Sequence, residues 1–270
     1  MSLETLAKSV SQSERLWIRG QGTKDAWRVA EVTGDCLDLT AYQGIVDYSP
    51  NDQVVAVRAG TLVDDLQREL AAYGQCLPIA ESLGTIGGSI AVNLPHLLEA
   101  KCGTWRDWTL GMTLVLADGT TAKSGSHAVK SVAGYDIHKL MIGARGSLAV
   151  IAEVILRTYP LKSLPQVDPA LRELARRFCA GDGGRAVAQR VLRTDFEEAR
   201  RQSVGLDIEG TSTLWRSLAP DEKVRRYPSD WVLRASELPI EDPVQIRLMQ
   251  RTKELFDGSA KLNAGVMGIF

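Results

Sequence analysis

The sequence predicts an α+β fold built around two glycine-rich segments. Strand-like β-branched runs and stretches with apolar residues three and four apart are interleaved along roughly the first 160 residues. They lack the regular strand–helix period of a doubly wound parallel sheet, which favours the α+β class. The glycine-rich segments, residues 19–24 (RGQGTK) and 84–89 (GTIGGS), each lie next to a strand-like run.

The first part of the chain predicts two helices and two strands. Residues 2–12 carry apolar residues at helical spacing, and residues 15–18 form a short strand that leads into the first glycine-rich segment. Residues 54–59 are β-branched and predict a strand. A helix then begins at Thr61, where Thr61 and Asp64 resemble a capping box, and ends at Gly74.

The second part predicts a hairpin and a long strand. Residues 109–117 form a strand that Asp118-Gly119 closes with a hairpin turn, so that residues 120–123 return beside it. Residues 147–159 alternate as a long strand. Beyond Pro160 we expect a linker and a helix-rich stretch over 169–202. Short strands near 214–215 and 231–233 and a last helix over about 243–256 complete the expected elements.

The composition excludes several classes of protein. In 270 residues, 32 basic and 33 acidic side chains leave a net charge near zero, which does not favour nucleic acid as a partner. No apolar run is long enough for a membrane span, and the N-terminus lacks the apolar core of a signal peptide, so we expect a cytoplasmic protein. The four cysteines are scattered without a Cys-x-x-Cys pair, which predicts neither an iron–sulfur cluster nor a metal site.

The two glycine-rich segments have the chemistry of a dinucleotide site. Glycine lets backbone N–H groups converge on phosphate oxygens, and Thr23 and Lys24 add a hydroxyl and a cation. Each segment also has a simpler interpretation: an ordinary turn for the first, and a tight helix–sheet packing corner for the second. The spacing of a Walker A loop is absent.

Other polar clusters leave alternatives open. Arg106 and Asp107 form a surface ion pair by default. Residues 129–136 (VKSVAGYD) are either a ligand-lining loop or a structured Ω-loop. The three histidines, His96, His127 and His138, do not have metal-ligand spacing, and no Gly-x-Ser-x-Gly nucleophile elbow is present. No catalytic residue can be named from the residues alone.

The motifs together identify a resemblance. Residues 19–24, the GTIGG segment, Arg106-Asp107, VAGYD at 132–136 and GSLAVIAE at 146–153 follow in the order of the vanillyl-alcohol oxidase/PCMH-type FAD-binding flavoproteins. Within that family the chain is similar to the FAD-binding E subunits of bacterial glycolate oxidase. Residues 253–257 and 262–265 resemble the family's closing motifs.

The resemblance implies a domain organisation and a set of FAD contacts. It implies a PCMH-type FAD-binding domain over 1–162, with subdomains of about 1–50 and 51–162, a shortened cap domain over 163–245, and a C-terminal segment over 246–270 that returns to the FAD domain. The implied cofactor-binding residues are Gly20, Gln21, Gly22, Thr23, Lys24, Thr85, Gly87, Gly88, Asn93, Arg106, Asp107, Gly134, Tyr135, Asp136, Gly146 and Ile151.

The resemblance also implies a function, although this sequence differs from the family's usual motifs at several positions. It implies a subunit of a glycolate oxidase or D-2-hydroxyacid dehydrogenase complex that binds FAD non-covalently and passes electrons to an iron–sulfur partner, beside a sister FAD-containing catalytic subunit that acts on a small 2-hydroxy acid such as glycolate or D-lactate. Ala149 stands where the family usually has glycine, Ser131 where asparagine is common, and Gly258 and Ala264 where proline is usual.

Two alternatives follow from these departures. The expected cap has only about 80 residues, and no histidine follows His138 to serve as the base found in related subunits. A degenerate assembly subunit with weak or no FAD binding is therefore the main alternative. A stand-alone FAD oxidase is the other, and it would need Tyr135 or a desolvated Lys130 as its base. We expect the protein to reach a membrane only through a partner.

Overall fold

The computed structural model describes most of the N-terminal part of the chain and its C-terminal helix. The described residues are 1–25, 33–79, 84–127, 135–167 and 242–263, with short pieces at 169, 172–173, 175–176, 186–190, 206–207, 213–217 and 231–232. No helix within these residues is long and apolar enough to cross a membrane.

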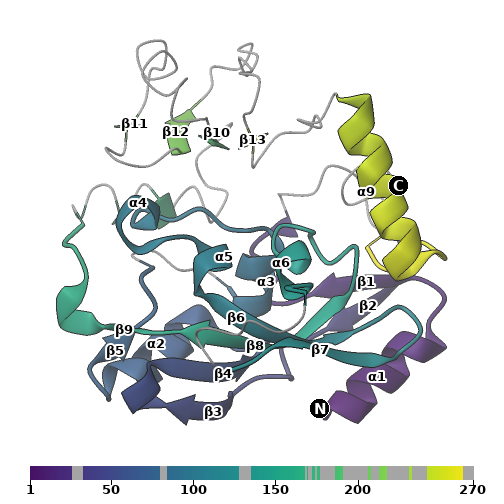
Figure 1. The fold of residues 1–270 in the computed structure, drawn as a ribbon, viewed down its shortest axis with the longest axis horizontal. Helices are drawn as coiled ribbons and strands as arrows, with labels where there is room; N and C mark the ends of the chain where they lie inside the picture. Colours follow the sequence, from purple (N-terminus) through teal and green to yellow (C-terminus); the bar gives the residue numbers. More distant parts are fainter. Residues whose placement is uncertain are drawn as a thin grey trace.

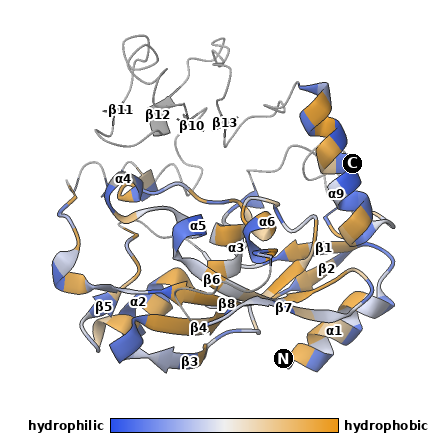
Figure 2. Cartoon of the chain, viewed as in Figure 1, coloured by the Kyte–Doolittle hydropathy of each residue, from blue (hydrophilic) through white to orange (hydrophobic). Residues whose placement is uncertain are grey.

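A five-stranded antiparallel sheet forms the base of the structure (Figure 1). Its strand order is β3-β4-β8-β6-β7, with bounds Ile45–Ser49, Val54–Arg58, Val150–Arg157, Thr109–Val115 and Thr121–Gly125. The central strands carry Val, Ile and Leu with few charges, as expected of strands buried on both faces. The apolar residues in Figure 2 accordingly concentrate on β4, β6 and β8.

Short helices cover the sheet and enclose its main core. They are α2 (Val63–Ala71), α3 (Ile86–Ala91), α4 (Glu99–Cys102), α5 (Trp105–Trp108) and α6 (His138–Met141). The core includes Leu66 and Leu70 of α2, Ile86 and Ile90 of α3, and Trp105 and Trp108 of α5 beside the sheet residues. A small pair, β5 (Gln75–Cys76) and β9 (Tyr159–Pro160), and two 3-10 turns, Pro50–Asp52 and Leu161–Ser163, complete this region.

A second, smaller core lies beside the first. Helix α1 (Leu3–Gln12) packs Leu6 and Val10 against β1 (Leu16–Arg19), β2 (Asp35–Asp38) and the end of β6. Strands β1 and β2 pair in parallel, and residue Leu262 forms a further parallel bridge with Leu16. The C-terminal helix α9 (Pro243–Asp257) stands next to this region in Figure 1. The described pieces between 186 and 232 form a four-stranded sheet, β11-β12-β10-β13, with bounds Leu206–Asp207, Thr213–Ser217, Ala186–Arg190 and Trp231–Val232.

The α+β class is confirmed, and the long predicted elements occur close to their expected bounds. The hairpin β6–β7, the long strand β8 and helices α1, α2 and α9 all match their sequence predictions. The start of α2 differs, because its N-cap residue is Leu62 and no side chain caps it. The Thr61 hydroxyl instead accepts a hydrogen bond from Gly44 N (2.8 Å), so a tertiary contact outcompetes the local cap.

Two further predictions need correction or extension. In the expected helix-rich stretch 169–202, the described residues 169, 172–173 and 175–176 are helical, whereas 186–190 form strand β10, which pairs with β12 and β13. Residues 191–202 lie outside the described residues. The second glycine-rich segment forms the first turns of α3, an element the sequence did not predict. The domain boundaries at 162 and 245 remain a prediction.

Candidate flavin-binding cavity

The first glycine-rich loop follows directly from β1. Residues Gly20–Lys24 leave the strand end, with Gly22 at φ +78°, a conformation that favours glycine. An ion pair between Arg19 and Asp25 (3.2 Å) spans the base of this loop, and the Arg19 guanidinium lies 5.4 Å from the Trp17 ring. Lys24 Nζ donates to the Thr23 hydroxyl (3.1 Å). The Arg19–Asp25 ion pair therefore closes the base of the loop, and Lys24, next to Asp25, adds a cation to it.

The second glycine-rich segment is the N-terminus of helix α3. Thr85 is the N-cap, and its Oγ1 accepts a hydrogen bond from Gly88 N (3.2 Å). Gly87 packs on Ala59 of the chain after β4, since a Cβ added at Gly87 would lie 2.7 Å from the Ala59 Cβ. The segment is thus a tight packing corner, in which Gly87 N also donates to the Ala59 carbonyl (2.9 Å). It lines a cavity as well, and its part in cofactor binding stays a prediction.

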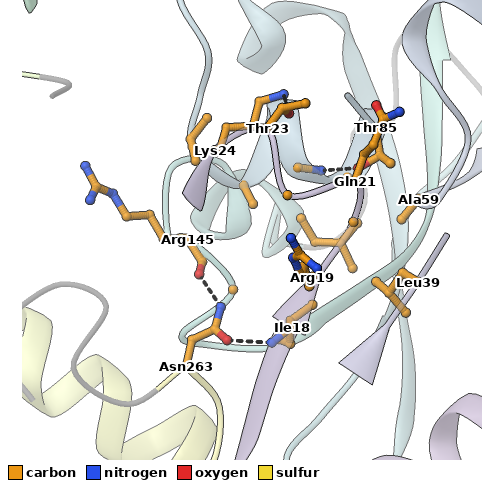
Figure 3. Close-up of a pocket in the computed structure, with 18 of the residues that line it drawn as sticks. Ile18, Arg19, Gln21, Thr23, Lys24, Leu39, Ala59, Thr85, Arg145 and Asn263 are labelled. Carbon is orange, nitrogen blue, oxygen red and sulfur yellow. Dashed lines mark hydrogen bonds between the residues drawn. The ribbon is translucent and has the colours of Figure 1, made fainter. Parts of the chain in front are cut away.

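The two glycine-rich segments touch each other. A Cβ added at Gly20 would lie 2.4 Å from Thr85 Oγ1, and one added at Gly84 would lie 2.3 Å from Thr23 Oγ1. Side chains at these positions would force the loops apart, because real Cβ atoms do not approach so closely. Segments some 60 residues apart in sequence therefore meet at the Thr23 and Thr85 side chains, which Figure 3 labels, and together they form one cradle.

The cradle lines a cavity of about 860 Å³, counted with its opening to solvent. The opposite wall comes from the start of β8 and from the C-terminal tail, through Arg145, Gly146, Ala149, Ile151 and Asn263. Leu39, Ala59, Ala91 and Val92 supply an apolar floor. The cavity thus combines a polar, glycine-rich side with an apolar side, as binding sites for dinucleotides with large rings require.

The charged groups of the cavity favour an anion. Arg19, Lys24 and Arg145 line it, and among the described lining residues the one carboxylate is that of Asp25, which pairs with Arg19. Burial lowers the pKa of Arg145 from its ordinary value. The Arg19 Nε is buried without a hydrogen-bond partner among the described residues. The glycine-rich loop 20–24 and this set of positive side chains fit the pyrophosphate of FAD.

The cavity brings together many of the residues named from the sequence. Its lining contains Gly20, Gln21, Gly22, Thr23, Lys24, Thr85, Gly87, Gly88, Gly146 and Ile151. Ala149, where the family usually has glycine, also lies in the wall and is almost fully buried. Gly134 lies outside the described residues, as do Lys130 and Ser131.

The other named residues lie away from the lining of this cavity. Asn93 follows the C-terminal end of α3, at φ +48°. Asp107 completes a capping box with Thr104 at the start of α5, and Arg106 donates to the Lys139 carbonyl (2.9 Å), so neither forms the surface ion pair expected by default. Tyr135 is 92% exposed and Asp136 is also exposed. Their part in binding stays a prediction.

Several lining residues were not assigned a cofactor contact from the sequence. Arg19 flanks the first loop, Ala59 and Leu39 come from strand ends, and Arg145 precedes Gly146. Asn263 belongs to the closing motif, whose spacing was noticed but whose side chain was not assigned a role. Adjacency to a recognised motif was the available signal for Arg19, Arg145 and Asn263, whereas only the fold places Leu39 and Ala59 here.

Comparisons with known proteins agree with this geometry. The FAD binding domain family model matches residues 3–125. The chain is 33% identical over 162 residues to glycolate oxidase subunit GlcE of Escherichia coli (strain K12), covering 58% of this chain and 46% of that one. It is 30% identical over 201 residues to the D-lactate dehydrogenase of Archaeoglobus fulgidus, covering 72% of this chain and 44% of that enzyme.

A third similar protein is another glycolate oxidase subunit. Glycolate oxidase subunit GlcD of Bacillus subtilis (strain 168) is 30% identical over 159 residues, which cover 57% of this chain and 34% of that one. The chain therefore spans less than half the length of each of these three relatives. The residues matched by the family model, 3–125, contain the two glycine-rich segments described above.

Proposed function

We propose that the chain is the FAD-holding subunit of a glycolate oxidase or D-2-hydroxyacid dehydrogenase complex of the PCMH-type flavoproteins, because the FAD binding domain model matches residues 3–125 and the chain is similar to two glycolate oxidase subunits. FAD is the cofactor of this domain. Its relatives include glycolate oxidase subunits and D-lactate dehydrogenases. The flavin, when bound, supplies the redox chemistry. The protein's own contribution is to bind and orient it.

The observation that carries the proposal is the contact between the two glycine-rich segments at one cavity. Residues 20–24 and the start of α3 line the same space. The first N–H groups of α3 donate within the protein, Gly87 to the Ala59 carbonyl (2.9 Å) and Gly88 to Thr85 Oγ1 (3.2 Å), so we assign the pyrophosphate mainly to the loop 20–24. Lys24 adds a positive charge on this side. The ring system would lie against the apolar floor, with Ile151 and Ala149 at its side. No covalent attachment is required for such a fit.

The cavity residues also suggest where the substrate reacts. Among the described residues that line the cavity there is no histidine, and the only carboxylate, Asp25, is already paired with Arg19. Removing a proton from a 2-hydroxy acid calls for a base whose pKa lies near the working pH. We therefore place the oxidation of a substrate such as glycolate or D-lactate mainly on a sister FAD-containing subunit, with electrons passing to an iron–sulfur partner.

One observation favours a second function. The Ala149 methyl group stands in the cavity wall, at a position where the family usually has glycine. A methyl group in that wall reduces the room for the cofactor. The alternative is accordingly an assembly subunit of the same kind of complex that retains the fold and binds FAD weakly or not at all.

An absorption spectrum of the purified full-length chain separates the two functions. The proposal expects a yellow protein with absorbance near 450 nm and release of about one FAD per chain on acid precipitation, as a non-covalently bound flavin requires. A colourless protein that takes up no added FAD would favour the assembly subunit. Restoring glycine with Ala149→Gly then tests the cause, because uptake of FAD by this variant alone would assign the loss to the added methyl group.

A further inference from the structure

The C-terminal tail extends the strand that carries the first glycine loop. Leu16 N donates to the Lys261 carbonyl (2.8 Å), and Asn263 N donates to the Leu16 carbonyl (2.8 Å). These bonds place residues 261–263 beside β1, on the edge opposite β2. Strand β1 runs directly into Gly20, so the tail helps to fix the point from which the first loop leaves the sheet.

The Asn263 side chain braces two walls of the cavity. Its Oδ1 accepts a hydrogen bond from Ile18 N (2.7 Å), and its Nδ2 donates to the Arg145 carbonyl (2.7 Å), as Figure 3 shows. Ile18 and Arg145 both line the cavity, from the end of β1 and from the turn before β8. Asparagine suits this position because it tolerates the left-handed backbone found here, at φ +43°.

The Asn263 side-chain amide also packs against Gly146 in the cavity wall. A Cβ added at Gly146 would lie 2.7 Å from Asn263 Nδ2, and Gly146 itself has φ +71°. The amide therefore fills the space that a side chain at Gly146 would occupy. A loss of this amide would free both the end of β1 and the Arg145–Gly146 turn, which together define one end of the cavity.

A buried ion pair holds this tail in place. Lys253 and Asp257 of α9 are 3% and 2% exposed, and Lys253 Nζ donates to Asp257 Oδ2 (2.6 Å), the Ser147 carbonyl (2.5 Å) and the Leu262 carbonyl (2.9 Å). Asp257 Oδ2 also accepts from Leu262 N (2.7 Å). All three ammonium hydrogens can thus be used, which offsets the cost of burying the charges. The pair fastens α9 to the residue after Gly146.

We propose that α9 and residues 258–263 form a C-terminal latch, in which Asn263 is a positioning residue that holds the end of β1 and the Arg145–Gly146 turn in register at one end of the FAD cavity. The inference rests on the proposed function to the extent that it requires FAD in this cavity. Because the latch and FAD would stabilise the same arrangement of β1 and the Arg145–Gly146 turn, their effects are coupled in both directions. FAD binding should strengthen the docking of the latch, and a weakened latch should lower FAD affinity.

The first test is a titration of the full chain with FAD, in which the change in flavin fluorescence measures binding. Asn263→Gly removes both side-chain hydrogen bonds while allowing the left-handed backbone, and we expect its Kd for FAD to rise about tenfold. Asn263→Asp keeps the acceptor for Ile18 N but loses the donor to Arg145, and it should weaken binding in the same direction.

A matched control is an amide side chain outside both the latch and the cavity. Gln67 Oε1 accepts from Leu77 N (2.8 Å) and Gln67 Nε2 donates to the Leu77 carbonyl (2.9 Å), and neither residue lines the cavity. Gln67→Ala should therefore lower the melting temperature and leave the Kd for FAD within about twofold of the wild type, since the two sites share no contact. An equal loss of FAD affinity in Gln67→Ala and Asn263→Gly would overturn the proposal.

Hydrogen exchange of the wild-type chain gives a readout that does not depend on any variant folding. We expect added FAD to slow amide exchange in residues 253–263 as well as in the two glycine-rich loops. Slowed exchange in the loops with unchanged exchange in 253–263 would overturn the latch alone. A wild-type chain that neither binds FAD nor changes its exchange would overturn the proposed function, which distinguishes the two failures.

Discussion

Gly20→Ala is expected to weaken FAD binding because the added methyl group enters the contact between the two glycine-rich loops. Its carbon would lie 2.4 Å from Thr85 Oγ1 and 2.9 Å from Thr85 Cγ2. Non-bonded heavy atoms normally rest about 3.5–4.0 Å apart, so the loops must separate by about 1 Å. The free protein can open the loops to relieve this strain, whereas binding a shared pyrophosphate requires them to close.

The expected magnitude follows from the cost of overpacking. Extra methyl groups in packed sites cost about 1–3 kcal/mol, which corresponds to a rise in the Kd for FAD of about 5- to 150-fold. Titration of the apoprotein with FAD, followed by absorbance and fluorescence, measures this Kd. Gly74→Ala is the control: no atom lies within 4 Å of its added Cβ, and its φ of +66° makes it destabilising for the backbone alone. It should lower stability without changing FAD affinity.

A double-mutant cycle tests the stated cause. Thr85→Ala removes both of the atoms nearest to the added methyl group, so the penalty of Gly20→Ala should shrink when it is measured in the Thr85→Ala background. The cycle is needed because Thr85→Ala also loses the N-cap of α3 and will weaken binding on its own. An unchanged Kd in Gly20→Ala, or an equal penalty in both backgrounds, would refute the reasoning.

Three further outcomes follow from the structure. Asp107→Ala removes the capping box of α5 and should lower the free energy of unfolding by about 1 kcal/mol. We expect the Kd for FAD to stay unchanged, and a higher Kd would instead include Asp107 in the binding site. Burial raises the pKa of the Cys76 thiol to about 11, whereas Cys36 is exposed, so iodoacetamide at pH 8 should label Cys36 and spare Cys76 in peptide mapping by mass spectrometry. Burial alone would raise the pKa of Asp257, but hydrogen bonds from Lys253 and from the Leu262 and Lys261 amides lower it below its ordinary 3.8. The ionised Asp257 therefore stabilises the folded state above pH 3.8, and this stabilisation is lost as the pH falls through the lower folded pKa. In urea unfolding measured at several pH values, Asp257→Asn should reduce the decrease in the free energy of unfolding at acid pH. An unchanged decrease would contradict the assignment.

The sequence by itself determined the elements whose signals are local. The alternation of residues 147–159, the Asp118-Gly119 turn and the helical spacing of residues 2–12 each specify an element through contacts within a few residues. The order of the glycine-rich motifs was enough to indicate the family and FAD. Glycine requirements are readable in this way because they arise from backbone geometry that other residues cannot adopt.

Only the tertiary structure decided which distant residues share the cavity. Thr61 resembled a helix cap in sequence, yet its hydroxyl bonds Gly44, because a partner brought close by the fold competes with the local N–H. Arg106 and Asp107 belong to one of the motifs by which the sequence resembles the FAD-binding family. In the structure, however, Arg106 donates a hydrogen bond to the Lys139 carbonyl, and Asp107 completes the capping box of α5. Asn263 reaches Ile18 across 245 positions of sequence, and such a contact has no local signature. Its place at the cavity wall is set by the burial of Lys253 and Asp257, which depends on the packing of α9 against the rest of the chain.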